Sequence, residues 1–177
     1  LDIVAPADNV ETRAAIRAAV THPRPLYIRF GKKVMPHLYD EHAEFHIGTA
    51  NVLRDGRDIA LIGTGETAAP AMEAAAQLQL NGIQARVISM HTIKPLDVEA
   101  ILKAGQDCAA VLTIEEHSVH GGLGEACAAV LLQAGIHKPF RILGVPDKDT
   151  VSGSQVDIFQ HYGLDAAGII AATSHLL

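Results

Sequence analysis

The stretch TIEEHSVHGGLGEACAAVLLQ, residues 113–133, predicts the end of a strand, a turn with three glycines and then a helix. The turn follows Glu115 and holds Gly121, Gly122 and Gly124. Beyond it, five apolar residues fall on one side of a helix: Leu123, Cys127, Val130, Leu131 and Ala134. Glycines between a strand and a helix let a backbone come close to a neighbour. The stretch therefore predicts an α/β unit and raises the question of what approaches its turn.

The remainder of the chain repeats this alternation. Continuous apolar runs predict buried strands at residues 58–63, 84–89, 109–115 and 140–145, and residues 45–56 predict an edge strand and a turn. Helices are expected after these strands, around residues 69–80, 97–104, 123–134, 155–162 and 165–175. Strands that are apolar throughout are typical of sheets with both faces covered. We therefore predict an α/β fold, a three-layer, mostly parallel sheet with helices on both faces.

The first 44 residues form a separate segment in this interpretation. LDIVAP and PLYIRF predict two short strands. Between them, Asp8 and Glu11 make a D-x-x-E capping pair for a helix that runs from about Asn9 to Val20. From Lys32 to about residue 44 the polarity rises and the apolar pattern ends. We expect a domain boundary there, with residues 1–44 on one side and residues 45–177 on the other.

Composition excludes several classes of function. The 177 residues carry a formal net charge of −6 and no basic stripe, which argues against nucleic-acid binding. No apolar stretch approaches the ~18 to 20 residues that a membrane span needs. Cys108 and Cys127 fall in a predicted strand and helix, and we expect them to be buried, reduced thiols of a cytoplasmic protein. The first residue is Leu1 rather than Met, which agrees with a piece of a larger protein.

Two patterns resemble ligand sites, but simpler interpretations are favoured. Gly63, Gly65 and Ala68 form G-x-G-x-x-A after a strand, as in dinucleotide sites. The next strand ends without the carboxylate that would bind a ribose, so an ordinary tight turn is favoured. Four potential metal ligands occur in the linker, His37, Asp40, His42 and His46. Their spacing is irregular, which favours a solvated linker over a metal site.

The glycine turn is the more interesting candidate. His117 and His120 stand beside Glu115 and Glu116 at the carboxyl end of a strand, where open α/β sheets place their functional residues. We favour an interface or the wall of a cleft over a metal site. The sequence has no Ser-His-Asp order, nucleophile elbow or Walker loop, so it predicts no catalytic residue and no self-contained active site.

Taken together and in order, several segments resemble the C-terminal section of transketolase. The most specific are TIKPLD at residues 92–97 and E-E-H-x-x-x-G-G-x-G-E-A at residues 115–126. VAPADNVETRAAIRAAV, PLYIRFGKK, IALIGTGETAAPAMEAA and SGSQVDIFQHYGLDAAGI extend the match over essentially the whole chain. Deoxyxylulose-phosphate synthase and the beta subunits of 2-oxoacid dehydrogenases share the architecture and part of the glycine pattern.

The resemblance implies a transferase that moves a two-carbon ketol unit between sugar phosphates with thiamine diphosphate and Mg²⁺. Residues 1–44 would be the tail of a pyrimidine-binding α/β domain with a linker, and residues 45–177 the transketolase C-terminal domain. In this family the glutamate that activates the cofactor and a G-D-G metal motif lie upstream, and these residues contain neither. We expect this chain alone to be inactive and to bind no cofactor. Its expected partner is an N-terminal section, on the same chain or a separate subunit, in a homodimer or hetero-oligomer.

The resemblance also implies roles for individual residues. Transketolases hold the substrate phosphate with a basic residue just after the strand that matches PLYIRF. That position is Lys32 here, with Arg29 close by, and a lysine offers a point charge in place of the usual arginine fork. The turn is implied to pack between domains and subunits, and its two glutamates to hydrogen-bond across that contact. The implied interface residues are Glu115, Glu116, His117, Gly121, Gly122 and Gly124.

Two alternatives remain open at this point. The chain could belong to deoxyxylulose-phosphate synthase or to a 2-oxoacid dehydrogenase E1 beta subunit. It could also be a stand-alone module that binds a nucleotide or an anion at residues 63–67.

Overall fold

A five-stranded sheet forms the centre of the computed structural model, which describes residues 1–31, 34–40 and 43–177. Its strands lie in the order β3-β5-β4-β7-β8. Their bounds are β3 Asn51–Arg54, β4 Ile59–Gly63, β5 Ala85–Ser89, β7 Ala110–Ser118 and β8 Phe140–Val145. β3 runs antiparallel to β5, and the other pairs are parallel. The predicted mostly parallel sheet is confirmed, and β3 is its edge strand.

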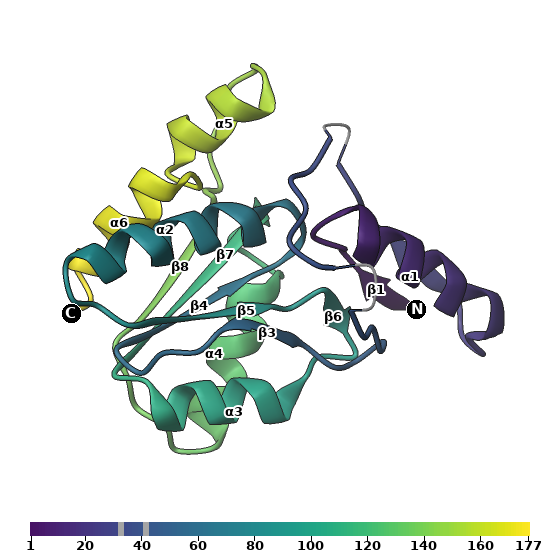
Figure 1. Ribbon diagram of the computed structural model, residues 1–177, viewed down its shortest axis with the longest axis horizontal. Coiled ribbons are helices and arrows are strands. Elements are labelled where there is room, and N and C mark those ends of the chain that lie inside the picture. Colours follow the sequence, from purple (N-terminus) through teal and green to yellow (C-terminus); the bar gives the residue numbers. More distant parts are fainter. Residues whose placement is uncertain (32–33, 41–42) are drawn as a thin grey trace.

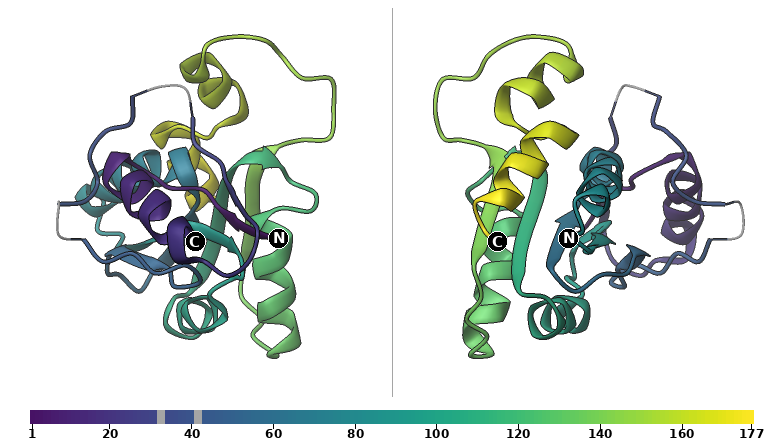
Figure 2. Two further views of the ribbon diagram at one scale, coloured as in Figure 1. Left: turned by 90° about the vertical axis from the view of Figure 1, so that its right-hand side faces the viewer. Right: turned by 60° about the vertical axis from the view of Figure 1, so that its left-hand side comes forward.

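Helices cover both faces of this sheet (Figures 1 and 2). The helices are α2 Ala68–Leu80, α3 Val98–Asp107, α4 Leu123–Gln133, α5 Gln155–Tyr162 and α6 Ala166–Ser174, with a short 3₁₀ turn, η1, at Gly65–Thr67. α2 and α6 pack on one face, and α3 and α4 on the other. α5 follows a long connection from β8 and projects from the body (Figure 1). None of the helices in the described ranges is long and apolar enough to cross a membrane.

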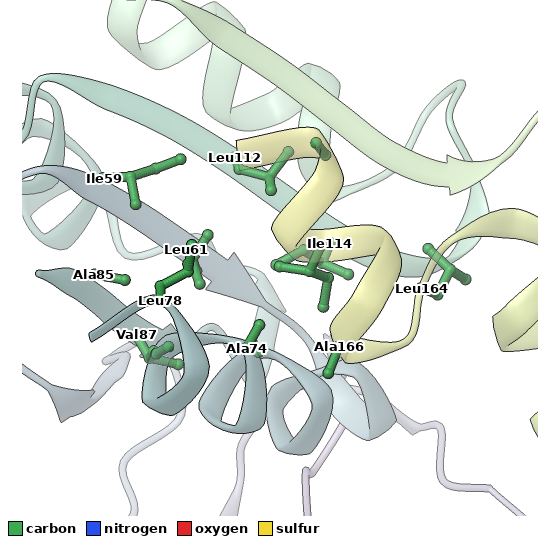
Figure 3. Packing of buried hydrophobic residues seen from close by; sticks show 14 of the residues in the cluster. Ile59, Leu61, Ala74, Leu78, Ala85, Val87, Leu112, Ile114, Leu164 and Ala166 are labelled. Carbon is green, nitrogen blue, oxygen red and sulfur yellow. The ribbon is translucent and has the colours of Figure 1, made fainter. Parts of the chain in front are cut away.

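The strands alternate between two hydrophobic cores because successive side chains point to opposite faces of a sheet. In β4, Leu61 joins the core under α2 and α6, and Ile62 joins the core under α3 and α4. Figure 3 shows Leu61 and Ile114 in the first core together with Leu78 of α2. Both faces of β4 are fully buried, which explains its apolar sequence. Each fully buried leucine or isoleucine side chain of this strand contributes about 1.5–3 kcal/mol by its burial.

The N-terminal segment lies beside the main sheet, at the end where β6 is found (Figure 1). It contains β1 Asp2–Val4, α1 Asn9–Thr21 and β2 Leu26–Ile28. β1 and β2 pair in parallel, and β6, Thr92–Lys94, pairs antiparallel with β1. A three-stranded sheet, β2-β1-β6, thus spans the boundary that the sequence predicts near residue 44.

Asp8 connects α1 to the segment that follows β2. Its Oδ1 atom accepts a hydrogen bond of 2.8 Å from the Glu11 amide and caps α1, as the sequence predicts. Its Oδ2 atom accepts from the amides of Leu38 and Tyr39 at 2.9 and 3.2 Å. Glu11 accepts from the amide of Ala7 at 2.7 Å, and its burial raises the pKa of the carboxyl group. Asp8 therefore anchors the segment after β2 to the start of α1, and Glu11 holds the residues that precede this helix.

Candidate functional site

A cleft of about 680 Å³ lies at the carboxyl ends of β4 and β7. β4 and β7 are neighbours in the sheet, and the chain leaves β4 toward β5 on one side and leaves β7 toward β8 on the other. Open α/β sheets bind ligands at such a switch point, where two neighbouring connections leave in opposite directions. Thr64 and Glu66 line the cleft from the end of β4, and Glu116 and His117 line it from β7. The fold thus places a hollow where the sheet topology favours a ligand.

Two more segments complete the walls of this cleft. Residues 29–31, after β2, form one wall, and residues 153–156, at the start of α5, form another. Among the described residues that line the cleft, Arg29 is the one arginine or lysine. The Nη1 atom of Arg29 donates a hydrogen bond of 2.8 Å to the main-chain oxygen of Glu116. Arg29 is otherwise exposed, so its guanidinium group can meet a molecule in the cleft.

Lys32, which the resemblance assigns to the substrate phosphate, lies outside the residues that the structure describes. Of the two residues with this assignment, the site can therefore be built only on Arg29.

Glu115 does not line the cleft, and its side chain binds α4. Its side chain is buried, and its two oxygens accept hydrogen bonds of 2.8 Å each from the amides of Leu123 and Gly124. These amides belong to the first turn of α4, where no helical partner exists for them. Burial raises the pKa of the Glu115 carboxyl group, against the opposing effect of the two amides. Glu115 thus binds the first turn of α4 from outside the helix, with partners for both of its oxygens within the chain, and its role at an interface stays a prediction.

Each of the three glycines of the turn is required for a different reason. A Cβ at Gly122 would lie 1.9 Å from Oε2 of Glu115, and a Cβ at Gly124 would lie 2.5 Å from Ile142 of β8. Gly121 has a φ of +73°, which favours glycine. The neighbour of Gly122 is therefore Glu115 of the same chain, and the neighbour of Gly124 is β8 of the main sheet. A role of the turn between subunits stays a prediction.

A bulge in β7 separates the directions of Glu115 and Glu116. Ile114 pairs with Leu143 and Ser118 with Val145, so three residues of β7 lie opposite the single residue Gly144. A Cβ at Gly144 would lie 2.8 Å from the main-chain oxygen of His117. Bulges re-aim side chains beside functional sites. This bulge brings Glu116 and His117 to the cleft, while Glu115 binds the first turn of α4.

Glu116 links two walls of the cleft. Its main-chain oxygen accepts from Arg29, and its Oε2 atom accepts a hydrogen bond of 3.3 Å from Nε2 of Gln155. Gln155 is the first residue of α5, which Ser154 and Asp157 cap with a reciprocal pair of hydrogen bonds. The sequence alone does not predict this wall. The S-x-x-D spacing of Ser154 and Asp157 marks the start of the helix, but no local signal places that start against β7.

The G-x-G-x-x-A turn closes on itself. The Thr67 hydroxyl lies 3.0 Å from the Thr64 amide and 2.8 Å from the Ile114 oxygen. Gly65 has a φ of +55°, and a Cβ added at this position would lie 3.5 Å from the Cβ of Ala5. These contacts favour the ordinary turn over a phosphate loop. Among the described residues, no group of three or more His, Cys, Asp or Glu side chains could hold a metal ion.

Comparison with known proteins supports the fold and the motifs. Residues 48–169 match the family model of the transketolase C-terminal domain. The chain belongs to this family. It is 44% identical, over 170 residues, to a protein of Phocaeicola vulgatus named as a subunit of apulose-4-phosphate transketolase. That match covers 96% of this chain and 54% of the relative.

Two further matches show how this chain relates to longer proteins of the family. A solved structure described as "Split gene transketolase, inactive beta4 tetramer" superposes with a TM-score of 0.91 at 36% identity, over 99% of this chain and 57% of that one. The chain is also 38% identical to 1-deoxy-D-xylulose-5-phosphate synthase 1 of Geobacter sulfurreducens, over 100% of this chain and 28% of the relative. The chain thus spans about half the length of the apulose-4-phosphate transketolase subunit and of the split-gene transketolase. The resemblance to transketolase and the predicted fold class are confirmed.

Proposed function

We propose that this chain is the C-terminal half of a transketolase subunit that works with a separate N-terminal subunit. The assembled enzyme would transfer a two-carbon ketol unit between sugar phosphates. The observation that carries the proposal is the 44% identity to a relative named as one subunit of a transketolase, which this chain matches over only 54% of the relative's length. The relation to a split-gene transketolase at a TM-score of 0.91 supports the same division.

Within this half, we propose two units. Residues 1–44 would be the tail of the pyrimidine-binding domain and the linker, and residues 45–177 the C-terminal domain. The parallel β1-α1-β2 unit supports the first, and the family match that begins at residue 48 supports the second. β6 reaches from the second unit to β1, so the two units would share one small sheet.

The substrate's phosphate would be held by Arg29, with Lys32 three residues further along the chain. Arg29 lines the cleft and, within residues 1–31, 34–40 and 43–177, makes one hydrogen bond, to Glu116, so four of its five N–H groups have no partner in these ranges. An arginine can bind phosphate through two parallel hydrogen bonds, and such charge-assisted bonds are about twice as strong as neutral ones. The proposed role in phosphate binding fits the position of the Arg29 guanidinium group in the cleft at the switch point of the sheet.

The family implies thiamine diphosphate and Mg²⁺, and we propose that neither is bound by this chain alone. No set of three acidic, histidine or cysteine side chains comes together among them as a metal site. The sequence also has no G-D-G motif. We therefore assign no catalytic step to this chain and propose that it is inactive and binds no cofactor alone. Its contribution would be packing, subunit association and the phosphate contact.

The expected assembly is a homodimer or hetero-oligomer in the cytoplasm. His117 and Gly121 are exposed on the turn and Glu116 is half-buried, so these three would meet a partner. Glu115, Gly122 and Gly124 would shape the surface from beneath. The buried free thiols of Cys108 and Cys127 agree with a reducing compartment.

Reconstitution tests the proposal. The complete subunit is combined with its N-terminal partner, thiamine diphosphate and Mg²⁺, and ketose phosphates are screened as donors with aldose phosphates as acceptors. We expect a new ketose phosphate that carries the donor's two carbons, and none when either subunit is omitted. The relation to a deoxyxylulose-phosphate synthase supports one other activity, condensation of pyruvate with an aldose phosphate and loss of CO₂. Turnover with pyruvate and not with ketose phosphates would overturn the transketolase proposal.

A further inference from the structure

The guanidinium group of Arg29 rests on a main-chain oxygen, that of Glu116, at 2.8 Å. The position of this oxygen depends on how the chain is held around it. We propose that Glu115 and Gln155 are positioning residues, which fix Glu116 and through it Arg29 at the substrate phosphate. The inference deepens the proposed function and rests on the phosphate role of Arg29.

Glu115 fixes the chain directly before Glu116. Both of its carboxylate oxygens are bound to amides of α4, each at 2.8 Å, and the side chain is buried. Gly122 leaves the space for this carboxylate, since a Cβ there would overlap it. A residue with two short bonds to a packed helix has little freedom. The peptide unit that joins Glu115 to Glu116 is therefore held at one end by α4.

The chain after Glu116 is fixed as well. The main-chain oxygen of His117 lies against Gly144 of β8, and the amide of Val119 donates to the oxygen of Val145 at 3.0 Å. The three bulge residues, 115–117, are thus held on both sides by contacts with neighbouring elements. The middle residue, Glu116, presents its oxygen to Arg29.

Gln155 holds Glu116 from the other wall. Its amide donates to the Glu116 carboxylate at 3.3 Å, and the contact is partly buried. Gln155 belongs to the first turn of α5, which the capping pair Ser154–Asp157 fixes. Glu116 is thus held by its side chain from α5 and by its main chain from β7. In this arrangement the contacts of Glu116 with α5 and of Glu115 with α4 both help to fix the position of the Arg29 guanidinium group.

The experiment uses the complete reconstituted enzyme with the ketose phosphate donor found by screening, and the same ketose without phosphate. The variants are Glu115→Gln, which puts an amide in place of one oxygen, and Gln155→Leu. Each is also made in an Arg29→Ala background. Asp165→Ala, which removes the cap of α6 at a residue that does not line the cleft, is the control for a general loss of stability.

We expect Glu115→Gln and Gln155→Leu to raise KM for the phosphorylated donor by about three- to tenfold, because small displacements of a binding group weaken its contacts. The kcat value and KM for the unphosphorylated ketose should change by less than about twofold, as both should in Asp165→Ala. In the Arg29→Ala background, which alone should raise KM about ten- to a hundredfold, neither variant should add a further increase.

Several results would overturn the inference. Equal effects on both ketoses, or effects that persist in the Arg29→Ala background, would leave Glu115 and Gln155 as structural residues. If Glu115→Gln fails to fold, the Gln155→Leu pair alone decides between these outcomes. An Arg29→Ala variant with unchanged KM would remove the phosphate contact itself, and the inference with it. A strong Arg29→Ala effect with no effect of Glu115→Gln or Gln155→Leu would overturn only this inference.

Discussion

The carboxylate of Glu115 occupies the space that a side chain at Gly122 would need, since a Cβ there would lie 1.9 Å from Oε2. The two residues are seven positions apart in the chain and belong to the end of β7 and the N-terminal boundary of α4. Gly122 has a φ of −103°, which any residue can adopt, so its requirement for glycine is one of space. The glycine and the buried acid form one unit that starts α4.

Gly122→Ala should therefore destabilise the domain by displacing Glu115 from its two amides. Leaving a buried group without a partner costs about 1–3 kcal/mol, and two amides lose their partner, so the free energy of unfolding in urea should fall by about 2–6 kcal/mol. Glu115→Ala should destabilise too, but Gly122→Ala should add little in that background, because the space is then free.

Gly135→Ala is the matched control for this prediction. Gly135 has a φ of +69°, and an added Cβ meets open space among the described residues. Its substitution should cost only the conformational strain of about 1 kcal/mol, with or without Glu115. If Gly122→Ala weakened subunit association while leaving unfolding unchanged, the intramolecular explanation of this glycine would be wrong.

The acidic residue Asp8 gives a second prediction. It caps α1 with one oxygen and binds the amides of Leu38 and Tyr39 with the other. Asp8→Ala should lower the free energy of unfolding by about 1–3 kcal/mol, as the loss of a cap and of the partner of two partly buried amides predicts. Hydrogen exchange at the Leu38 and Tyr39 amides should quicken most.

Asp165→Ala serves as the control here as well, because it removes a cap of α6 without touching residues 34–40. It should lower stability without quickening exchange at Leu38 and Tyr39 selectively. Unchanged exchange at these amides in Asp8→Ala would contradict the anchoring role.

The sequence predicted the order and type of most elements because their patterns are local, but it did not predict the short strand β6 or the 3₁₀ geometry of η1. The strand predicted at residues 140–145 is the observed β8, and the helix predicted at residues 155–162 is α5. The strand predicted to end at Glu115 continues to Ser118, because the bulge lets β7 pair again with Val145. A bulge depends on the neighbouring strand, which a single-segment pattern does not contain.

The site was harder to predict for the same reason. The sequence singled out Glu115, Glu116 and the glycines as one group, whereas in the structure Glu115 and Glu116 bind different partners. Gln155 and Arg29 are 126 positions apart, and only the folded sheet brings both to Glu116. Periodicity and spacing carry no information on such contacts.

His91 predicts how stability depends on pH. It is fully buried at the end of β5, stacked on Phe45 with ring centroids 4.4 Å apart. Burial lowers its pKa to about 4 from the ordinary histidine value of 6.5. Between these two values the unfolded chain binds a proton at His91 that the folded chain does not. Stability should therefore rise with pH across this window and be fully present above it.

The size of this effect is on the order of 3 kcal/mol for a shift of this kind. Urea unfolding at pH 4.5 and pH 7.5 measures it, in the natural protein and in His91→Gln. The difference between the two pH values should shrink in His91→Gln, and it should not in His175→Gln, which changes an exposed histidine. An equal pH dependence in all three proteins would show that His91 does not titrate across the window.

Arg29→Lys separates the charge of the proposed phosphate contact from its shape. Lysine keeps the positive charge but loses the planar fork with which arginine can bind Glu116 and a phosphate at the same time. In the complete enzyme we expect KM for the phosphorylated donor to rise by roughly two- to tenfold, the loss of about one hydrogen bond. The unphosphorylated ketose should be unaffected, and Arg29→Ala should be worse than Arg29→Lys. If the lysine variant matched the natural enzyme, the cleft would need only a positive charge, and the bond between Arg29 and the Glu116 oxygen would have no part in substrate binding.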